Sequence, residues 1–223
     1  METKKKTLTI LTYINSALIL VLSAVLIVVV QHDHNGDAGK KPQAEQKRFE
    51  QGQRVSIDLD NLIVNAVWQG NKDANTTITV FNSFTCGYCA RAVGLIDRLE
   101  NEHSPNIKIA FKHFIRNPTD KIAAHAFECA GEQDKAMDMY RTIFAKGPQN
   151  DYSAYAREIG IKGSQFTSCM SSNKYSSKIE NDLNQGIEIG ISGTPAFLIQ
   201  DRLVVGLQPY EVFDKVISMS KND

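Results

Sequence analysis

The chain has 223 residues, of which 42% are hydrophobic, with 25 Lys and Arg against 25 Asp and Glu and only 4 cysteines. This length corresponds to one domain or two. A formal net charge of zero gives no general attraction for nucleic acid. The counts of 14 Gly, 6 Pro and 4 Cys exclude collagen-like, disordered and disulfide-dense small scaffolds. The composition is therefore that of an ordinary globular protein.

The N-terminus carries a membrane signal. Basic residues at 4–6 precede the segment 7–31, which has no charged side chain and is mostly Leu, Ile, Val and Ala toward its end. About 20 mostly apolar residues cross a bilayer, so we expect 1–6 to be a cytoplasmic tail and 7–31 an uncleaved transmembrane signal-anchor. A cleaved secretory signal is the alternative, with a small-residue site at 36–38. In both interpretations, the rest of the chain is expected outside the cytoplasm.

Residues 32–53 are expected to form a flexible linker, because they are rich in His, Asp, Gly, Lys and Gln and poor in apolar residues. His32 and His34 could form a weak metal-binding tract, but a solvated linker is the stronger interpretation. A folded domain over 54–219 follows, and it is long enough for a substantial core.

The first half of this domain predicts a β-α-β unit. Residues 76–84 are β-branched and aromatic, which predicts a strand that ends at a Cys-x-x-Cys motif, Cys86-Gly87-Tyr88-Cys89. Apolar residues after Cys89 recur at helical spacing, so the motif opens a helix. Residues 106–115 alternate between apolar and polar side chains, which predicts a second strand.

The second half predicts a helical block and then a hairpin. Residues 119–190 have helical periodicity throughout, punctuated by glycines. After Gly193-Thr194-Pro195, the segments 196–199 and 203–205 predict two strands joined by a turn, and an amphipathic helix closes the domain.

The position of the Cys-x-x-Cys motif indicates redox chemistry. A motif that leaves a strand and enters a helix in a β-α-β context is typical of thioredoxin-like folds. Backbone N–H groups and the dipole at the helix start are expected to stabilise a thiolate on Cys86. A stabilised reduced form makes the disulfide a stronger oxidant.

Three other interpretations of Cys86 and Cys89 are weaker. A structural zinc site usually takes two closely spaced ligand pairs, whereas Cys129 and Cys169 are isolated in the sequence. Covalent haem attachment requires His after the second cysteine, where this chain has Ala90. An inert structural disulfide remains open as a minor alternative.

Four segments form a combined pattern, namely Phe84-Thr85-Cys86-Gly87-Tyr88-Cys89, Phe111-Lys112-His113-Phe114, the stretch 122–140 with its Ala-Phe-Glu-Cys-Ala, and Gly190-Ile191-Ser192-Gly193-Thr194-Pro195. Together they resemble the DsbA-like family of thioredoxin-fold thiol-disulfide oxidoreductases, over residues 65–219. The resemblance implies an α/β class, with a thioredoxin-like fold in which a helical domain at about 118–190 is inserted between the second strand of the β-α-β unit and the cis-proline strand. The transmembrane helix expected from the N-terminal sequence would precede this domain.

The resemblance also implies roles for residues beside the cysteines. Pro195 is expected to follow a cis peptide bond, with the Thr194 backbone placed to pair with an extended substrate. Gly87 and Tyr88 are expected to tune the site. Strong oxidants of the family have Pro-His there, so we expect the Cys86 pKa to exceed their value of roughly 3.5 and the potential to lie below roughly −120 mV. Cys-Gly-Tyr-Cys with this threonine also resembles DsbC-type isomerases, whose separate N-terminal dimerisation domain does not fit in residues 32–64.

Cys129 and Cys169 have two interpretations. They could be small buried hydrophobes of the helical block. In an oxidising compartment a structural disulfide is preferred, and some DsbA-like relatives carry a second, non-catalytic bridge in this region. His113 and His125 are most simply satisfied structural histidines, and no role is assigned to them.

The expected function is a membrane-tethered thiol-disulfide oxidoreductase that forms, isomerises or reduces disulfides through Cys86 and Cys89. Its partners are then cysteine-containing secreted or envelope proteins and a membrane redox protein that reoxidises or reduces it. It needs no cofactor and no metal. Its catalytic domain is expected in the periplasm or an equivalent extracytoplasmic space, at the cytoplasmic membrane. The alternative is a non-enzymatic, membrane-anchored chaperone or assembly subunit that keeps a thioredoxin-like peptide-binding module.

Overall fold

A computed structural model describes residues 51–221. Within this range no helix is both long and apolar enough to cross a bilayer. The expected tail, signal-anchor and most of the linker lie outside the described residues, as do His32 and His34. They stay predictions.

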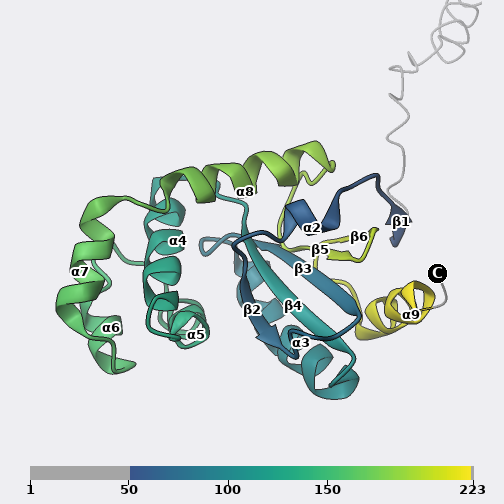
Figure 1. Cartoon of the computed structure of the whole chain (residues 1–223), viewed down its shortest axis with the longest axis horizontal. Coiled ribbons are helices and arrows are strands. Elements are labelled where there is room, and N and C mark those ends of the chain that lie inside the picture. The colour runs from purple at the N-terminus through teal and green to yellow at the C-terminus, as the bar shows by residue number, and fades with distance from the viewer. Residues whose placement is uncertain (1–50, 222–223) are drawn as a thin grey trace, which may run out of the picture. The chain divides into compact units, whose positions relative to one another are not determined.

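The centre of the domain is a six-stranded mixed sheet with the order β1-β6-β5-β3-β4-β2 (Figure 1). The middle strands β3 and β4 run parallel, and every other neighbouring pair is antiparallel. The strands are β1 (Gln53–Arg54), β2 (Val67–Gly70), β3 (Thr76–Asn82), β4 (Ile107–His113), β5 (Ala196–Ile199) and β6 (Arg202–Val205).

The predicted β-α-β unit consists of β3, α3 (Gly87–His103) and β4. All seven residues of β3 are buried, as expected for a central strand covered on both faces. Helix α3 buries Cys89, Ala92, Ile96 and Leu99, which share one face at helical spacing. The parallel pairing of β3 with β4 follows, because a helical crossover returns the chain in the same direction.

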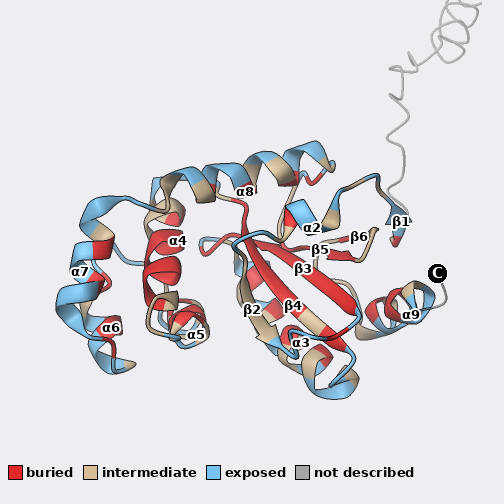
Figure 2. Cartoon of the chain, viewed as in Figure 1, coloured by how far each residue is buried: buried red, intermediate tan, exposed pale blue. Residues whose placement is uncertain are grey.

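Each face of the sheet has its own core. Successive side chains of a strand point to opposite faces, so Val80 joins one cluster and Phe81 the other. Residues of α3, of the helical block and of α9 (Tyr210–Ser220) fill the first cluster. The second is covered by α2 (Leu59–Leu62) and the end of α8 (Ser176–Glu188). In Figure 2 the strands β3, β4 and β5 and the inward sides of the helices are mostly buried, whereas β2 is mostly intermediate.

The helical block lies between β4 and β5 in the chain, so the expected thioredoxin-like fold with a helical insertion is confirmed. Asn117 caps its first helix, accepting a hydrogen bond from the Asp120 N–H at 2.9 Å, and Pro118 occupies the first turn. The five helices are α4 (Pro118–Gly131), α5 (Ala136–Lys146), α6 (Ser153–Glu158), α7 (Gly163–Ser172) and α8 (Ser176–Glu188).

Helix α8 returns the chain to the sheet and is held there by close packing. A Cβ atom at Gly186 would lie 2.8 Å from the Phe114 ring, so only glycine lets the helix approach this closely. The residues after α8 then lead directly into Thr194, Pro195 and β5. The insertion thus delivers the threonine-proline loop to the end of the sheet where α3 begins.

A buried group of charged residues ties the insertion to the sheet. Lys112 of β4 lies 2.5 Å from Asp182 of α8, and Lys178 bridges Asp182 at 3.0 Å and Glu128 of α4 at 2.7 Å. Two cations and two anions balance, so none of the four is left as an uncompensated buried charge. Removing one partner would leave its mate unpaired in the core.

The folded part begins slightly before the predicted boundary at Arg54. The Gly52 N–H donates to the Leu203 carbonyl at 2.8 Å, and Gln53 already belongs to β1. The strands β1 and β2 and the helix α2 were not predicted, because they are two to four residues long and carry no clear periodicity.

Candidate active site

Cys86 is the residue just before the first turn of α3, at the end of the loop that connects β3 to this helix. Its backbone is extended, and the Ala90 N–H donates to its carbonyl at 3.2 Å, closing the first helical turn. Thr85 and Gly87 on either side are exposed, and Cys86 itself is half-buried. The structure holds both Cys86 and Cys89 as free thiols, so it represents the reduced form.

The surroundings of Cys86 favour its thiolate. Burial by itself raises the pKa of Cys86, but the Thr194 hydroxyl, the Cys89 backbone N–H and thiol and the Tyr88 N–H all lower it, and the net pKa is below the ordinary value. These donors are neutral. The Tyr88 and Cys89 groups belong to the start of α3, where unpaired N–H groups and the dipole favour an anion, whereas Thr194 lies in the loop before β5.

Cys89 lies three residues later on the inner face of α3, and its environment is the opposite. It is fully buried. Burial is the largest influence and raises the pKa of Cys89 to about 12, with a further contribution from charge on Cys86, while the Ser83 backbone and the Thr194 hydroxyl oppose it. The pair therefore has one half-buried sulfur with a lowered pKa and one shielded sulfur that stays protonated near neutral pH.

The threonine-proline loop closes over the sulfurs. The Thr194–Pro195 peptide bond is cis, and the Cys86 thiol donates to the Thr194 carbonyl at 3.3 Å. The Gly206 N–H donates to the Pro195 carbonyl at 2.7 Å and fixes the loop to the end of β6. The Thr194 hydroxyl is buried without another protein partner among the described residues. It is therefore free to donate to a thiolate on either cysteine.

Two residues that the sequence analysis did not identify hold the loop before Cys86. The buried carboxylate of Asp120 accepts the Phe84 N–H at 2.6 Å and the Arg116 N–H at 3.0 Å. The Asn117 amide donates to the Thr85 hydroxyl at 3.0 Å. The start of the helical insertion is thus attached to the strand end that presents Cys86. The Asn-Pro-x-Asp pattern signals a helix cap, but it does not reveal this long-range contact.

The two residues between the cysteines differ in what they contribute. Gly87 has no side chain, and open space surrounds its Cα. Tyr88 is 60% exposed, and the Arg91 guanidinium lies 5.3 Å from its ring centroid. The Tyr88 side chain is therefore part of the outer surface of the site, and only its backbone N–H is among the groups that act on Cys86.

The other two cysteines lie in the helical insertion. Cys129 of α4 and Cys169 of α7 are buried and form a disulfide, with a sequence separation of 40. His113 lies 2.7 Å from Glu128, and His125 lies 3.1 Å from the Ser176 hydroxyl, so both histidines have structural partners.

One group of possible metal ligands lies within the described residues outside the cysteines, namely His113, Glu128 and Asp182. Two lysine side chains already neutralise its carboxylates. A cation would have to displace these ammonium groups, and the set does not suit a metal ion.

Comparison with known proteins agrees with this geometry. The family profile described as Thioredoxin matches residues 63–219. An Na(+)/H(+) antiporter NhaA of Herminiimonas arsenicoxydans is 26% identical over 156 residues, which are 69% of this chain and 25% of the antiporter. The chain thus spans about a quarter of the length of the antiporters it matches. A Rickettsia typhi protein named as a candidate protein-disulfide oxidoreductase is 26% identical, covering 77% of this chain and 68% of that protein.

Solved structures share the fold. A thioredoxin-like oxidoreductase from Silicibacter pomeroyi has a TM-score of 0.69 at 22% identity, covering 75% of this chain and 99% of that one. The thiol-disulfide exchange protein alpha-DsbA2 from Wolbachia pipientis has a TM-score of 0.65 at 23% identity, covering 72% and 91%. The chain therefore belongs to the thioredoxin family, with a helical block inserted in the fold.

Proposed function

We propose that the protein exchanges disulfides with cysteine-containing secreted or envelope proteins through Cys86 and Cys89. In the oxidising direction, a substrate thiolate attacks Cys86 of the Cys86–Cys89 disulfide, forms a mixed disulfide and releases Cys89 as a thiolate. A second substrate thiolate attacks the substrate sulfur of that bond. The substrate disulfide forms, Cys86 leaves as a thiolate, and the enzyme is reduced. In the reverse direction Cys86 attacks a substrate disulfide, and Cys89 resolves the mixed disulfide.

The observation that carries this proposal is the inequality of the two sulfurs. A nucleophile must be accessible and ionised, and the half-buried Cys86 with its lowered pKa meets both conditions. A resolving thiol must be close but protected from other reagents, and the buried Cys89 with its raised pKa meets these. A purely structural disulfide would require neither difference.

Thr194 and Pro195 are proposed to present the substrate. The Thr194 carbonyl already accepts a hydrogen bond from Cys86, so a substrate strand that pairs with this backbone would bring its own sulfur beside the nucleophile.

The direction of exchange is proposed to be that of a poised exchanger with isomerase or reductase character rather than a strong oxidase. Every group that lowers the Cys86 pKa is neutral. The Tyr88 side chain is not among these groups, because it lies at the surface beside Arg91. Without a charged donor between the cysteines, the thiolate is less stabilised than in a strong oxidant, so the potential is lower.

The activity is tested with the purified full chain and a peptide that contains two cysteines. Equilibration with glutathione buffers gives the reduction potential, which we expect below roughly −120 mV. Parallel assays compare oxidation of the reduced peptide with repair of a scrambled substrate, and repair should be the faster. A double Cys129→Ser/Cys169→Ser variant is the matched control for removal of cysteines, and it should keep the activity. Failure of the wild type to exchange disulfides with any peptide would refute the proposal.

The proposed setting is the outer side of the cytoplasmic membrane, with residues 7–31 as the anchor and the N-terminus inside. The protein should then remain in the membrane fraction after alkaline carbonate washing. Added protease should reach the domain that contains Cys86 only from outside the membrane. Recovery of a soluble chain that begins near Gly39 would instead indicate a cleaved signal.

A further inference from the structure

Tyr140 of α5 carries a buried polar group that the proposed mechanism leaves without a role. The side chain is 1% exposed, and its hydroxyl has no hydrogen-bond partner among the described residues. Nearly all buried hydroxyls in proteins are hydrogen-bonded, because leaving one unpaired destabilises the fold. The position therefore calls for a reason other than stability, since phenylalanine would fill the same space.

The surroundings of the Tyr140 ring are apolar and aromatic. Four phenylalanine rings pack around it, with centroid distances of 5.8 Å to Phe84, 5.1 Å to Phe111, 6.1 Å to Phe127 and 4.8 Å to Phe144. Phe84 belongs to the loop that leads into Cys86. The packing fixes the ring, so the direction of its hydroxyl is fixed as well.

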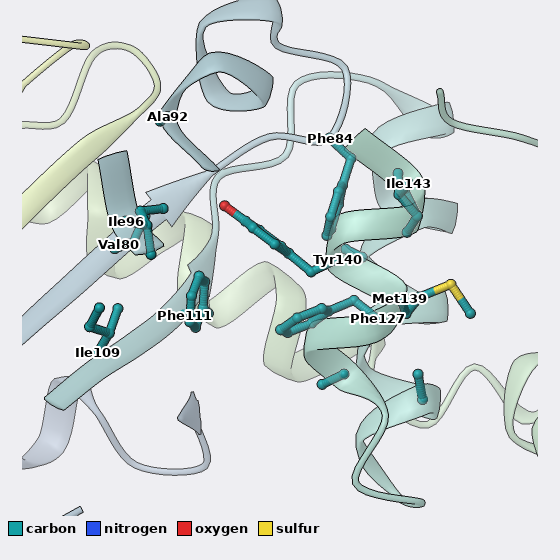
Figure 3. Close-up of a cluster of buried hydrophobic side chains, with 14 of the residues drawn as sticks. Val80, Phe84, Ala92, Ile96, Ile109, Phe111, Phe127, Met139, Tyr140 and Ile143 are labelled. Carbon is teal, nitrogen blue, oxygen red and sulfur yellow. The ribbon is translucent and has the colours of Figure 1, made fainter. Parts of the chain in front are cut away.

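The hydroxyl is directed toward the catalytic helix. Figure 3 shows the Tyr140 ring extending from α5 toward the side of the cluster where Ala92 and Ile96 of α3 lie, with the oxygen at its leading end. Those two residues and Cys89 form the same buried face of α3, and Cys89 is the member nearest the helix start. The unpaired O–H thus lies in the part of the core that contains the resolving sulfur.

The electrostatics agree with this placement. Burial is the largest influence and raises the pKa of Tyr140 well above its usual value, and charge on Cys89 and then Asp97 raises it further against the effect of Arg141. The phenol therefore stays protonated when Cys89 is ionised, which makes it a hydrogen-bond donor and excludes it as a base.

We infer that the Tyr140 hydroxyl is a hydrogen-bond donor to the Cys89 thiolate, formed when that sulfur becomes charged during exchange. When a substrate thiolate attacks Cys86, the Cys86–Cys89 bond breaks and both bonding electrons stay on the Cys89 sulfur. This buried anion has few partners, and Tyr140 stabilises it without giving up its proton. In the reverse direction the same bond stabilises the Cys89 thiolate that attacks the mixed disulfide. In the dithiol form Cys89 carries its own proton, which explains why the hydroxyl is unpaired there.

The inference rests on the proposed function and is tested with the full-length Tyr140→Phe variant. Oxidised protein is mixed with excess reduced glutathione, and loss of the Cys86–Cys89 disulfide is followed by acid quench and mass spectrometry. Removing one donor to a developing thiolate should slow this reaction about fivefold to thirtyfold. The melting temperature of the reduced protein should stay the same or rise, because an unpaired buried hydroxyl has been deleted.

Tyr152→Phe provides the matched control. Tyr152 is equally buried, but its hydroxyl has a partner, because it accepts the Gln149 N–H at 3.0 Å. Its loss should lower the melting temperature and leave the exchange rate unchanged. We thus expect Tyr140→Phe to change the exchange rate and Tyr152→Phe to change the melting temperature.

Each other outcome has a definite meaning. An exchange rate of Tyr140→Phe equal to that of the wild type would overturn the inference. A lower melting temperature or a misfolded Tyr140→Phe protein would also overturn it, because the hydroxyl would then have a structural partner. If the wild type itself fails to react with glutathione, the proposed function fails instead.

Discussion

The two cysteine pairs of this protein have the same chemistry available to them, but their surroundings differ. Cys86 and Cys89 lie at a helix start with one sulfur half-exposed, and free N–H groups and a hydroxyl point at it. Cys129 and Cys169 are both buried within the helical insertion and are joined across α4 and α7. The first site stabilises a thiolate, whereas the second offers no access to one.

This difference shows how the position of each pair in the fold sets its accessibility and the length of the loop that its bridge closes. A bridge within one helical turn closes almost no loop and gives little conformational stabilisation, so it can open and close during turnover. A bridge that closes a loop of about 40 residues lowers the entropy of the unfolded chain. In the loop-entropy treatment this stabilises the folded state by on the order of 4 kcal/mol. Under the proposed function, the same kind of bond serves exchange in one region and stability in the other.

The largest effects should follow from substitutions at the first pair. Cys86→Ser removes the nucleophile, so exchange should fall by about a thousandfold or more. Cys89→Ser keeps the nucleophile but cannot resolve the intermediate, so mixed disulfides with substrates should accumulate on non-reducing gels. Equal trapping by both variants would contradict the assignment of roles.

The second pair should respond in stability instead. Cys129→Ser/Cys169→Ser should lower the free energy of unfolding by about 2–4 kcal/mol, measured by denaturant titration. In the wild type, mild reductant should make only Cys86 and Cys89 accessible to alkylation, because structural disulfides have lower potentials than catalytic ones. Finding Cys129 and Cys169 as free thiols in protein from an oxidising compartment would disprove the bridge.

A smaller effect is expected from Thr194→Val, which keeps the shape of the side chain and removes its hydroxyl. The hydroxyl lowers the pKa of both active-site cysteines, so the variant should have a higher Cys86 pKa and a several-fold lower thiolate reactivity near neutral pH. Thiolate absorbance against pH measures this. A titration curve that coincides with that of the wild type would remove Thr194 from the site.

The smallest change is expected from Tyr88→His. A histidine at this position adds a donor that can be positively charged, so the Cys86 pKa should fall and the reduction potential should rise. Because the wild-type Tyr88 side chain lies at the surface, the fold should be unaffected. A potential that falls, or stays constant, would show that the intervening dipeptide does not set the direction of exchange.

Features that depend on neighbouring residues could be predicted from the sequence, whereas features that depend on residues far apart in the chain could not. The strand-helix-strand unit around Cys86, the helical block and the final hairpin follow from local periodicity, and they agree with β3, α3, β4 and the later elements. The strands predicted over 76–84 and 106–115 were two and three residues too long, because Phe84 and Phe114 are apolar but lie beyond the paired residues. The short edge strands β1 and β2 have no pattern of their own and exist through pairing with β6 and β4.

Within the site, the motif identifies Cys86 and Cys89, and the resemblance supplies Thr194 and Pro195. The contacts of Asp120 with Phe84 and the orientation of Tyr140 could not be predicted, because each joins residues far apart in the chain. An acidic residue in a first helical turn and an apolar-face tyrosine are both ordinary in sequence. Only the packed structure shows what they face.

The central claim, that one sulfur is the nucleophile and the other the protected resolving thiol, is tested most directly by alkylation of the reduced wild type across a pH series, with each cysteine quantified by mass spectrometry. A lowered pKa means that Cys86 ionises first as the pH rises, while Cys89 ionises only near pH 12. Modification should therefore begin at Cys86 and reach its plateau there while Cys89 is still unmodified. Parallel modification of the two cysteines, or earlier modification of Cys89, would contradict the claim.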